Sequence, residues 1–245
     1  MERNLDVCDK MTIVQTRRGW CQELMGCQAR TEFKYYNSSD VHFASSLDDS
    51  SCLCRLCCAP SYPFKSTVVE EGTNEEILTM TRPFKCPVGA MKCCCYQELT
   101  ITPPPDASSS SPPPIGRIVE QCWFCVPRFL VLDGSGREVY KLHQPTCLGG
   151  LCVDCCAAGN PCGRGCCKVP FAVFDAGETG TDGRGSKERE KGKILKKPRS
   201  LASELFTDAD VFEVDMPKGA TTEEKAMLIG ATAFLNANFF EGGGS

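Results

Sequence analysis

The sequence lacks the features that mark several large classes of protein. Residues 1–25 hold no apolar run and several charges, so we expect no cleaved secretory signal. His42 and His143 stand singly, without a nucleophile–base pattern or a phosphate-binding loop, so we expect no covalent enzyme chemistry. The net charge of −4 does not suggest nucleic acid as a partner. No long helical period occurs before residue 200, which points away from a mainly helical fold.

The abundant residue is cysteine, with 20 in a chain of 245 residues. Such a density is typical of short secreted disulfide scaffolds, but this chain is far longer. Without a secretory start we expect a reducing, intracellular compartment. There, many thiols indicate metal ligands, lipid acceptors or buried side chains rather than disulfides.

Most of the chain is predicted to form short β-strands. Runs rich in Val, Ile, Thr, Phe and Tyr, bounded by Gly, Pro, Asp or Asn, predict nine of them. These are Glu32–Asn37, Phe64–Glu70, Glu76–Arg82, Gln97–Thr102, Gly116–Trp123, Phe129–Leu132, Glu138–His143, Phe171–Phe174 and Val211–Met216. The Pro/Ser tract 103–114 and the polar segment 177–191 are predicted as exposed loops. The pattern favours an all-β barrel or sandwich.

Two similar hairpins, at residues 63–86 and 127–147, are flanked by cysteines on both sides. Because an antiparallel hairpin brings its two ends together, we expect the cysteine clusters to gather at one end of the sheet.

The C-terminal segment 221–241 is predicted to be a helix, with Thr221 as its cap and acids in the first turn. It is apolar on every side, so it must be surrounded by protein or lipid. It is short for a membrane span and holds Asn236 and Asn238, which favours burial inside the β structure. We therefore expect one domain over 1–241 with a flexible tail at 242–245.

Ordered motifs along the chain resemble the phospholipid scramblase family. They are Cys52-x-Cys54-x-x-Cys57-Cys58-Ala59-Pro60, Arg82-Pro83-Phe84-Lys85-Cys86, Cys93-Cys94-Cys95-x-Gln97-Glu98, Pro114-Ile115-Gly116 and Phe206-Thr207-Asp208-Ala209-Asp210 through Phe239-Phe240-Glu241. The resemblance implies a mainly β fold: a closed antiparallel barrel of about twelve strands around a buried hydrophobic C-terminal helix, similar to the tubby C-terminal domain. It also implies a place at the cytoplasmic face of a membrane, most naturally the plasma membrane.

The cysteines have two competing predicted uses. Cys93, Cys94 and Cys95 match the family's thioacylated cluster, which implies palmitoylation. The CxxC spacings instead suit thiolate pairs on a metal ion, and two pairs at one barrel end would complete a zinc site, with an iron–sulfur cluster as the alternative. The candidate ligands are Cys54, Cys57, Cys122, Cys125, Cys152 and Cys155.

Two further sites follow from the resemblance and are weighed against plainer interpretations. The segment from Asp208 to Gly219 aligns with the family's proposed calcium loop, with Asp208, Asp210 and Asp215 as candidate ligands, although the segment also alternates like a half-buried strand. The basic patch of Lys191, Lys193, Lys196 and Lys197 falls at a family import segment and suits anionic lipid or a solvated strand face equally.

Two functions are carried forward. The first is a membrane-associated scramblase-type protein that promotes ATP-independent, bidirectional movement of phospholipids. The second is a non-catalytic structural or interaction module, a subunit of a larger assembly with protein partners.

Overall fold

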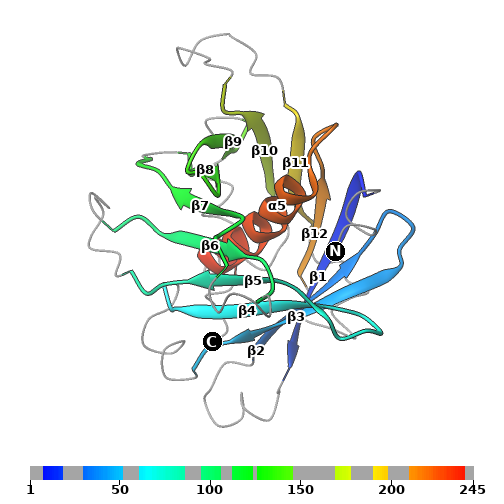
Figure 1. Cartoon of the computed structure of the whole chain (residues 1–245). Coiled ribbons are helices and arrows are strands. Elements are labelled where there is room, and N and C mark those ends of the chain that lie inside the picture. Colours follow the sequence, from blue (N-terminus) through cyan, green and yellow to red (C-terminus); the bar gives the residue numbers. More distant parts are fainter. Residues whose placement is uncertain are drawn as a thin grey trace, which may run out of the picture.

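The fold is a closed β-barrel with a helix along its interior, seen in the computed structural model of the chain (Figure 1). The structure describes residues 8–18, 30–51, 61–85, 95–105, 112–123, 126–145, 169–177, 190–197 and 210–240. The strands in this part of the chain are β1 Lys10–Arg18, β2 Arg30–Tyr36, β3 His42–Asp49, β4 Phe64–Glu70, β5 Glu76–Arg82, β6 Glu98–Thr102, β7 Gly116–Glu120, β8 Arg128–Asp133, β9 Glu138–His143, β10 Val169–Asp175, β11 Gly192–Lys197 and β12 Asp210–Asp215.

Each strand pairs antiparallel with its neighbours in the sequence, and β1 closes the barrel by pairing with β12. The closing register runs from Lys10 opposite Asp215 to Gln15 opposite Asp210. Closure gives every described strand a partner on both sides, so none of them forms a free sheet edge. The predicted mainly β, closed antiparallel barrel is thus confirmed.

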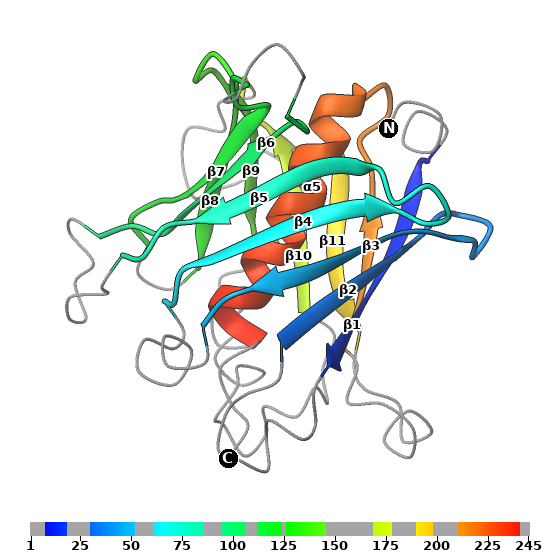
Figure 2. The ribbon, with the colours of Figure 1, turned by 60° about the horizontal axis from the view of Figure 1, so that its bottom comes forward.

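The helix α5 Thr222–Leu235 continues into the π-helical segment η1 Asn236–Phe240. Thr221 caps it: its side chain accepts from the backbone N–H of Glu224, whose carboxylate in turn accepts from the N–H of Thr221. Every residue from Lys225 to Leu235 is buried, and the helix lies along the inside of the barrel (Figure 2). No helix in the described part of the chain is long and apolar enough to span a membrane.

The interior is filled from both sides. Inward-pointing side chains such as Leu78, Ile101 and Val131 pack against the helix and are fully buried. Phe234 contributes an edge-to-face contact with Phe129 at a ring-centroid distance of 5.7 Å. The result is a single apolar core shared by helix and strands.

The antiparallel order gives the barrel two distinct ends. At one end lie the turns β2–β3, β4–β5 and β8–β9 and the start of α5; we call it the turn end. At the other lie the last residues of the odd-numbered strands, the first residues of the even-numbered strands, and η1. Every cysteine except Cys8 falls in a segment that joins strands at this second end, which we call the cysteine end.

Candidate functional site at the cysteine end

The hairpin prediction for the cysteines agrees with the strand topology. The segments that carry the predicted acylation and metal ligands connect β3 to β4, β5 to β6, β7 to β8 and β9 to β10, all at the cysteine end. Cys95 is half-buried and Cys122 is exposed, both as free thiols. The remaining predicted ligands, Cys54, Cys57, Cys93, Cys94, Cys125, Cys152 and Cys155, lie outside the described residues. Within the described residues no group of three or more His, Cys, Asp or Glu is arranged to hold a metal ion.

A buried arginine organises one side of this end. Arg82 is the last residue of β5 and only 1% of it is exposed. Its Nη2 donates to Gln97 Oε1 at 3.0 Å and to Asn238 Oδ1 at 2.8 Å. Its guanidinium also lies over the Phe234 ring, 5.8 Å from the centroid. Arg82 thereby links the sheet to the end of the helix.

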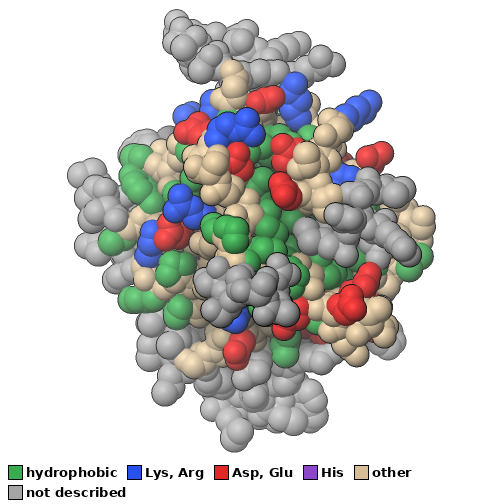
Figure 3. Space-filling model, in the orientation of Figure 1, with side chains coloured by type: hydrophobic (Ala, Val, Ile, Leu, Met, Phe, Trp, Pro, Cys, Tyr) green, Lys and Arg blue, Asp and Glu red, His purple; other side chains and the backbone are tan. Residues whose placement is uncertain are grey.

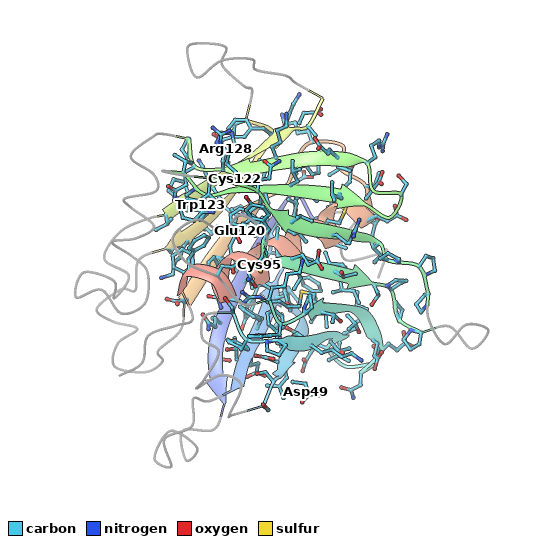
Figure 4. The ribbon with its side chains drawn as sticks, turned by 90° about the vertical axis from the view of Figure 1, so that its left-hand side faces the viewer. Asp49, Cys95, Glu120, Cys122, Trp123 and Arg128 are labelled. Atoms are coloured by element: carbon cyan, nitrogen blue, oxygen red, sulfur yellow. The ribbon has the colours of Figure 1, made fainter. Side chains whose placement is uncertain are left out.

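The network continues from Gln97 to a buried carboxylate. The backbone N–H of Gln97 donates to Glu120 Oε2 at 3.1 Å, and Trp123 Nε1 donates to Glu120 Oε1 at 2.9 Å. Figure 4 shows Glu120, Cys122 and Trp123 close together, with Arg128 beside them. Glu120 is 3% exposed, so its two carboxyl oxygens accept hydrogen bonds from these donors rather than from bulk water.

A second buried cation holds the other side. Lys196 Nζ lies 3.2 Å from Asp210 Oδ1, and both side chains are 3% exposed. The same ammonium lies 4.6 Å from the centroid of the Phe240 ring. Arg82 and Lys196 therefore contact η1 from two separate parts of the barrel, one through Asn238 and the other through Phe240.

The predicted calcium ligands are not brought together by β12. Asp210 begins the strand with its side chain in the barrel, paired with Lys196. Asp215 ends it with a half-exposed side chain on the outer face, 3.8 Å from Lys10 Nζ. At about 3.3 Å per residue the two positions are about 16 Å apart along the strand, too far for one ion. Asp208 lies outside the described residues.

The predicted basic patch is divided between the two faces of β11. Lys196 points inward and is unavailable to a membrane or an import receptor in this conformation. Lys193 and Lys197 point outward, where Lys193 pairs with Glu190 at 3.4 Å and Lys197 with Glu213 at 2.6 Å. Lys191 precedes the strand and is half-buried.

The face of the molecule drawn in Figure 3 carries charges of both signs rather than a patch of one sign. In the orientation of Figure 1, hydrophobic side chains lie at the centre of the face, and Lys and Arg are interspersed with Asp and Glu (Figure 3). A hollow of about 260 Å³ over β2, β3 and β4 is lined by Glu32, Glu70 and Glu71. Their carboxylates disfavour a phosphate headgroup there.

Arg82, Glu120 and Lys196 were not predicted from the sequence to be interior groups. The alternation of inward and outward side chains along a strand could have indicated their position. Arg82 lies on the same face of β5 as buried Leu78 and Met80, and Lys196 lies on the same face of β11 as buried Ile194. The alternation does not predict the hydrogen-bond partners of Arg82, because Arg82, Gln97 and Asn238 are brought together only by the folded barrel.

Fold and site together define a class: a closed antiparallel barrel around a C-terminal helix, whose helix end and cysteine-bearing connections share one end of the barrel. The family model for Scramblase matches residues 3–158 and 182–242, and the chain belongs to this family. It is 29% identical over 224 residues to human phospholipid scramblase 1, covering 91% of this chain and 60% of that protein.

Two further relatives give the same result. The chain is 27% identical to phospholipid scramblase 2 of Bos taurus, with coverage of 89% and 64%, and 24% identical to human phospholipid scramblase family member 5, with coverage of 89% and 69%. The chain thus spans less than two thirds of the length of the first two relatives. No solved structure matches.

Proposed function

We propose that this chain is a membrane-associated protein of phospholipid scramblase type. It promotes the ATP-independent, bidirectional movement of phospholipids between leaflets, without a covalent step. The proposal is supported by the family match over most of the chain and by relatives named phospholipid scramblases. The observation that carries it is structural: the connections that bear nearly all the cysteines share one end of the barrel.

In this proposal the cysteine end faces the cytoplasmic leaflet, with the plasma membrane as the membrane concerned. Acyl chains on Cys93, Cys94 and Cys95 anchor this end, because two chains hold a protein on a bilayer stably where one does not. Phe84, adjacent to β5 at this end, is 51% exposed and adds apolar surface. Lys193 and Lys197 point outward and are paired with Glu190 and Glu213. They attract anionic lipid only when they leave these carboxylates and bind a lipid phosphate instead.

The lipid path in this proposal runs outside the barrel. A headgroup needs a polar, hydrated route across the hydrocarbon, since an unsatisfied polar group there costs several kcal/mol. The interior is occupied by α5, whose Leu228, Ala231 and Phe234 are fully buried, and by the apolar strand residues that pack around it. We therefore assign lipid movement to the membrane around the docked cysteine end.

The direct test is reconstitution. Full-length protein in phosphatidylcholine–phosphatidylserine vesicles should expose inner-leaflet fluorescent lipid to dithionite without ATP, in the presence and absence of calcium. Heat-denatured protein in the same vesicles is the control. Lipid movement no faster than in the control, from protein whose circular dichroism shows a folded barrel, would contradict the transport proposal.

The anchoring step has its own test. Replacing Cys93, Cys94 and Cys95 with Ser should lower the membrane-bound fraction in cells by tenfold or more. Cys8→Ser is the matched control, because Cys8 lies at the opposite end and is 2% exposed. Equal membrane binding by the triple variant and the control would remove acylation of this cluster.

A thiolate metal site is proposed for the same end of the barrel. Pairs drawn from Cys54, Cys57, Cys122, Cys125, Cys152 and Cys155 would supply four thiolates to one zinc, which would tie neighbouring connections together. This proposal is tested by measuring the zinc content of the purified protein and titrating its thiols. We expect one zinc per chain and four thiols that are protected from the thiol reagent. Metal-free protein in which none of the six candidate cysteines is protected from the thiol reagent would exclude it.

We also propose that the chain has protein partners in a larger assembly. Crosslinking in membranes would test this proposal.

A further inference from the structure

The buried pair of Lys196 and Asp210 carries an inference that does not depend on lipid transport. Lys196 on β11 lies opposite Phe212 on β12, and Asp210 is the next inward position along β12. The diagonal geometry brings Nζ to within 3.2 Å of Oδ1, and neither side chain is more than 3% exposed. Such a pair is retained only while both charges are present, because each would otherwise be a buried, uncompensated ion.

The pair is also joined to the end of the core helix. The Lys196 ammonium lies 4.6 Å from the centroid of the Phe240 ring, and Phe240 packs against Phe212 with ring centroids 6.0 Å apart. Phe240 is the last residue of η1 and is 5% exposed. We call Lys196, Asp210 and Phe240 the clamp. Its contacts connect two strands to the final turn of the helix.

The same arrangement opposes a calcium role for Asp210. Calcium needs six to eight oxygens at about 2.3–2.6 Å. The next inward positions after Asp210 are Phe212 and Val214, which are 1% and 0% exposed and have no side-chain oxygen. Gly219, at the position where a calcium loop has its closing carboxylate, lies beyond the far end of β12. A cation at Asp210 would also have to displace the ammonium of Lys196 into an apolar surrounding.

We propose that the clamp of Lys196, Asp210 and Phe240 fixes η1 against β11 and β12, and that Asp210 is not a calcium ligand in this chain. Any calcium response must then arise from other residues. The segment that resembles the family's calcium loop serves, at Asp210, to hold the core helix in place.

A double-mutant cycle on the full chain tests the clamp. We expect Lys196→Met and Asp210→Asn each to lower Tm by at least about 6 °C, since breaking a buried pair strands one charge. The double variant should be no less stable than either single variant. Lys197→Met is the matched control: it removes the neighbouring surface pair with Glu213 and should shift Tm by less than about 2 °C. Single variants that behave like this control would overturn the clamp.

Calcium titration tests the statement that Asp210 is not a calcium ligand. Calorimetric titration with calcium chloride should give the same result for wild type and Asp210→Asn. Calcium affinity that falls tenfold or more in Asp210→Asn but not in Lys196→Met would overturn the assignment. Wild-type protein supplies a measurement free of folding defects: deuterium uptake of peptides covering 236–240 should not change when calcium is added. Faster uptake on calcium addition would show the ion releasing η1 and would equally overturn the proposal.

Discussion

At the scale of single residues, the barrel shows how charges are tolerated inside a protein. Arg82, Glu120, Lys196 and Asp210 are each at least 97% buried, and all lie at the cysteine end. Each has a partner of suitable chemistry, whether a carboxylate, an amide, an indole N–H or an aromatic ring. Removing one partner leaves the other buried without its contact, which costs more than the contact itself contributes.

The Arg82 network gives a first prediction. Arg82→Met deprives buried Gln97 Oε1 and half-buried Asn238 Oδ1 of their donor, and leaving a buried polar group unpaired costs about 1–3 kcal/mol. We expect the free energy of unfolding, measured in urea, to fall by about 3 kcal/mol. Arg137→Met, which removes a 77% exposed side chain paired with Asp133, should cost less than about 1 kcal/mol. Equal losses in both variants would contradict this role for Arg82.

A buried tyrosine gives a prediction for alkaline pH. Burial raises the pKa of Tyr35, whose hydroxyl hydrogen-bonds Ser46 Oγ at 2.9 Å. The folded state therefore favours the protonated phenol, and this contribution to stability is complete below the unfolded pKa of about 10 and declines above it. Between pH 10 and 11, where the unfolded phenol goes from half to almost fully ionised, wild type should lose about 1 kcal/mol more unfolding free energy than Tyr35→Phe. If the unfolding free energies of wild type and Tyr35→Phe, measured in urea, fall equally across this pH range, the prediction is contradicted.

At the scale of elements, the helix fits the barrel because certain positions have no side chain. Gly116, in β7, lies against the helix: a Cβ there would be 2.2 Å from Met227 Sδ and 2.5 Å from the backbone oxygen of Leu132. The carbonyl belongs to the neighbouring strand and cannot move without disturbing the sheet. The close approach explains why the Pro-Ile-Gly motif ends in glycine.

Gly116→Ala should therefore destabilise the protein even though alanine is a small residue. We expect a loss of about 1–3 kcal/mol, the usual range for overpacking a core. Gly177→Ala is the control, because a Cβ there meets only the Asp175 carboxylate at 3.5 Å. The measurement is urea unfolding of both variants, and an unchanged midpoint for Gly116→Ala would refute the packing described for α5.

At the scale of the whole molecule, the two ends of the barrel should differ in thiol chemistry. Cys122, at the cysteine end, is exposed, whereas Cys8 is buried and its Sγ donates to the carbonyl of Lys10 at 2.9 Å. Burial raises the pKa of Cys8, so little reactive thiolate is present at neutral pH.

Maleimide labelling followed by mass spectrometry should modify Cys122 at least ~100-fold faster than Cys8 in native protein. In urea the two rates should converge. Rapid labelling of Cys8 under native conditions would mean that the turn end opens without global unfolding.

The sequence alone predicts the regular parts of this fold well. Phe64–Glu70, Glu76–Arg82 and Glu138–His143 are found with the predicted bounds, and the helix begins after Thr221 as its cap predicts. β3 was not predicted because its inward positions include Ser46 and Asp48, which hide the apolar alternation. β1 was also missed.

The candidate site was less accessible to prediction. Thr81 and Lys197 point outward, whereas their neighbours Arg82 and Lys196 point inward. Only the register of each strand decides which member of the pair faces the interior. The contacts to Asn238 and Phe240 join positions far apart in the chain, so they depend on barrel closure. The cysteine end was predicted because it requires only that a hairpin brings its own ends together.

The position of α5 in the chain has a consequence for synthesis. β1 cannot complete its pairing until β12 has been made, and the helix that fills the interior follows β12. On the ribosome, up to twelve strands therefore emerge before the residues that complete their core. Such late, non-local completion makes folding slow and leaves apolar strand faces exposed in the meantime. A nascent chain of this protein should accordingly depend on chaperones until its final helix has been translated.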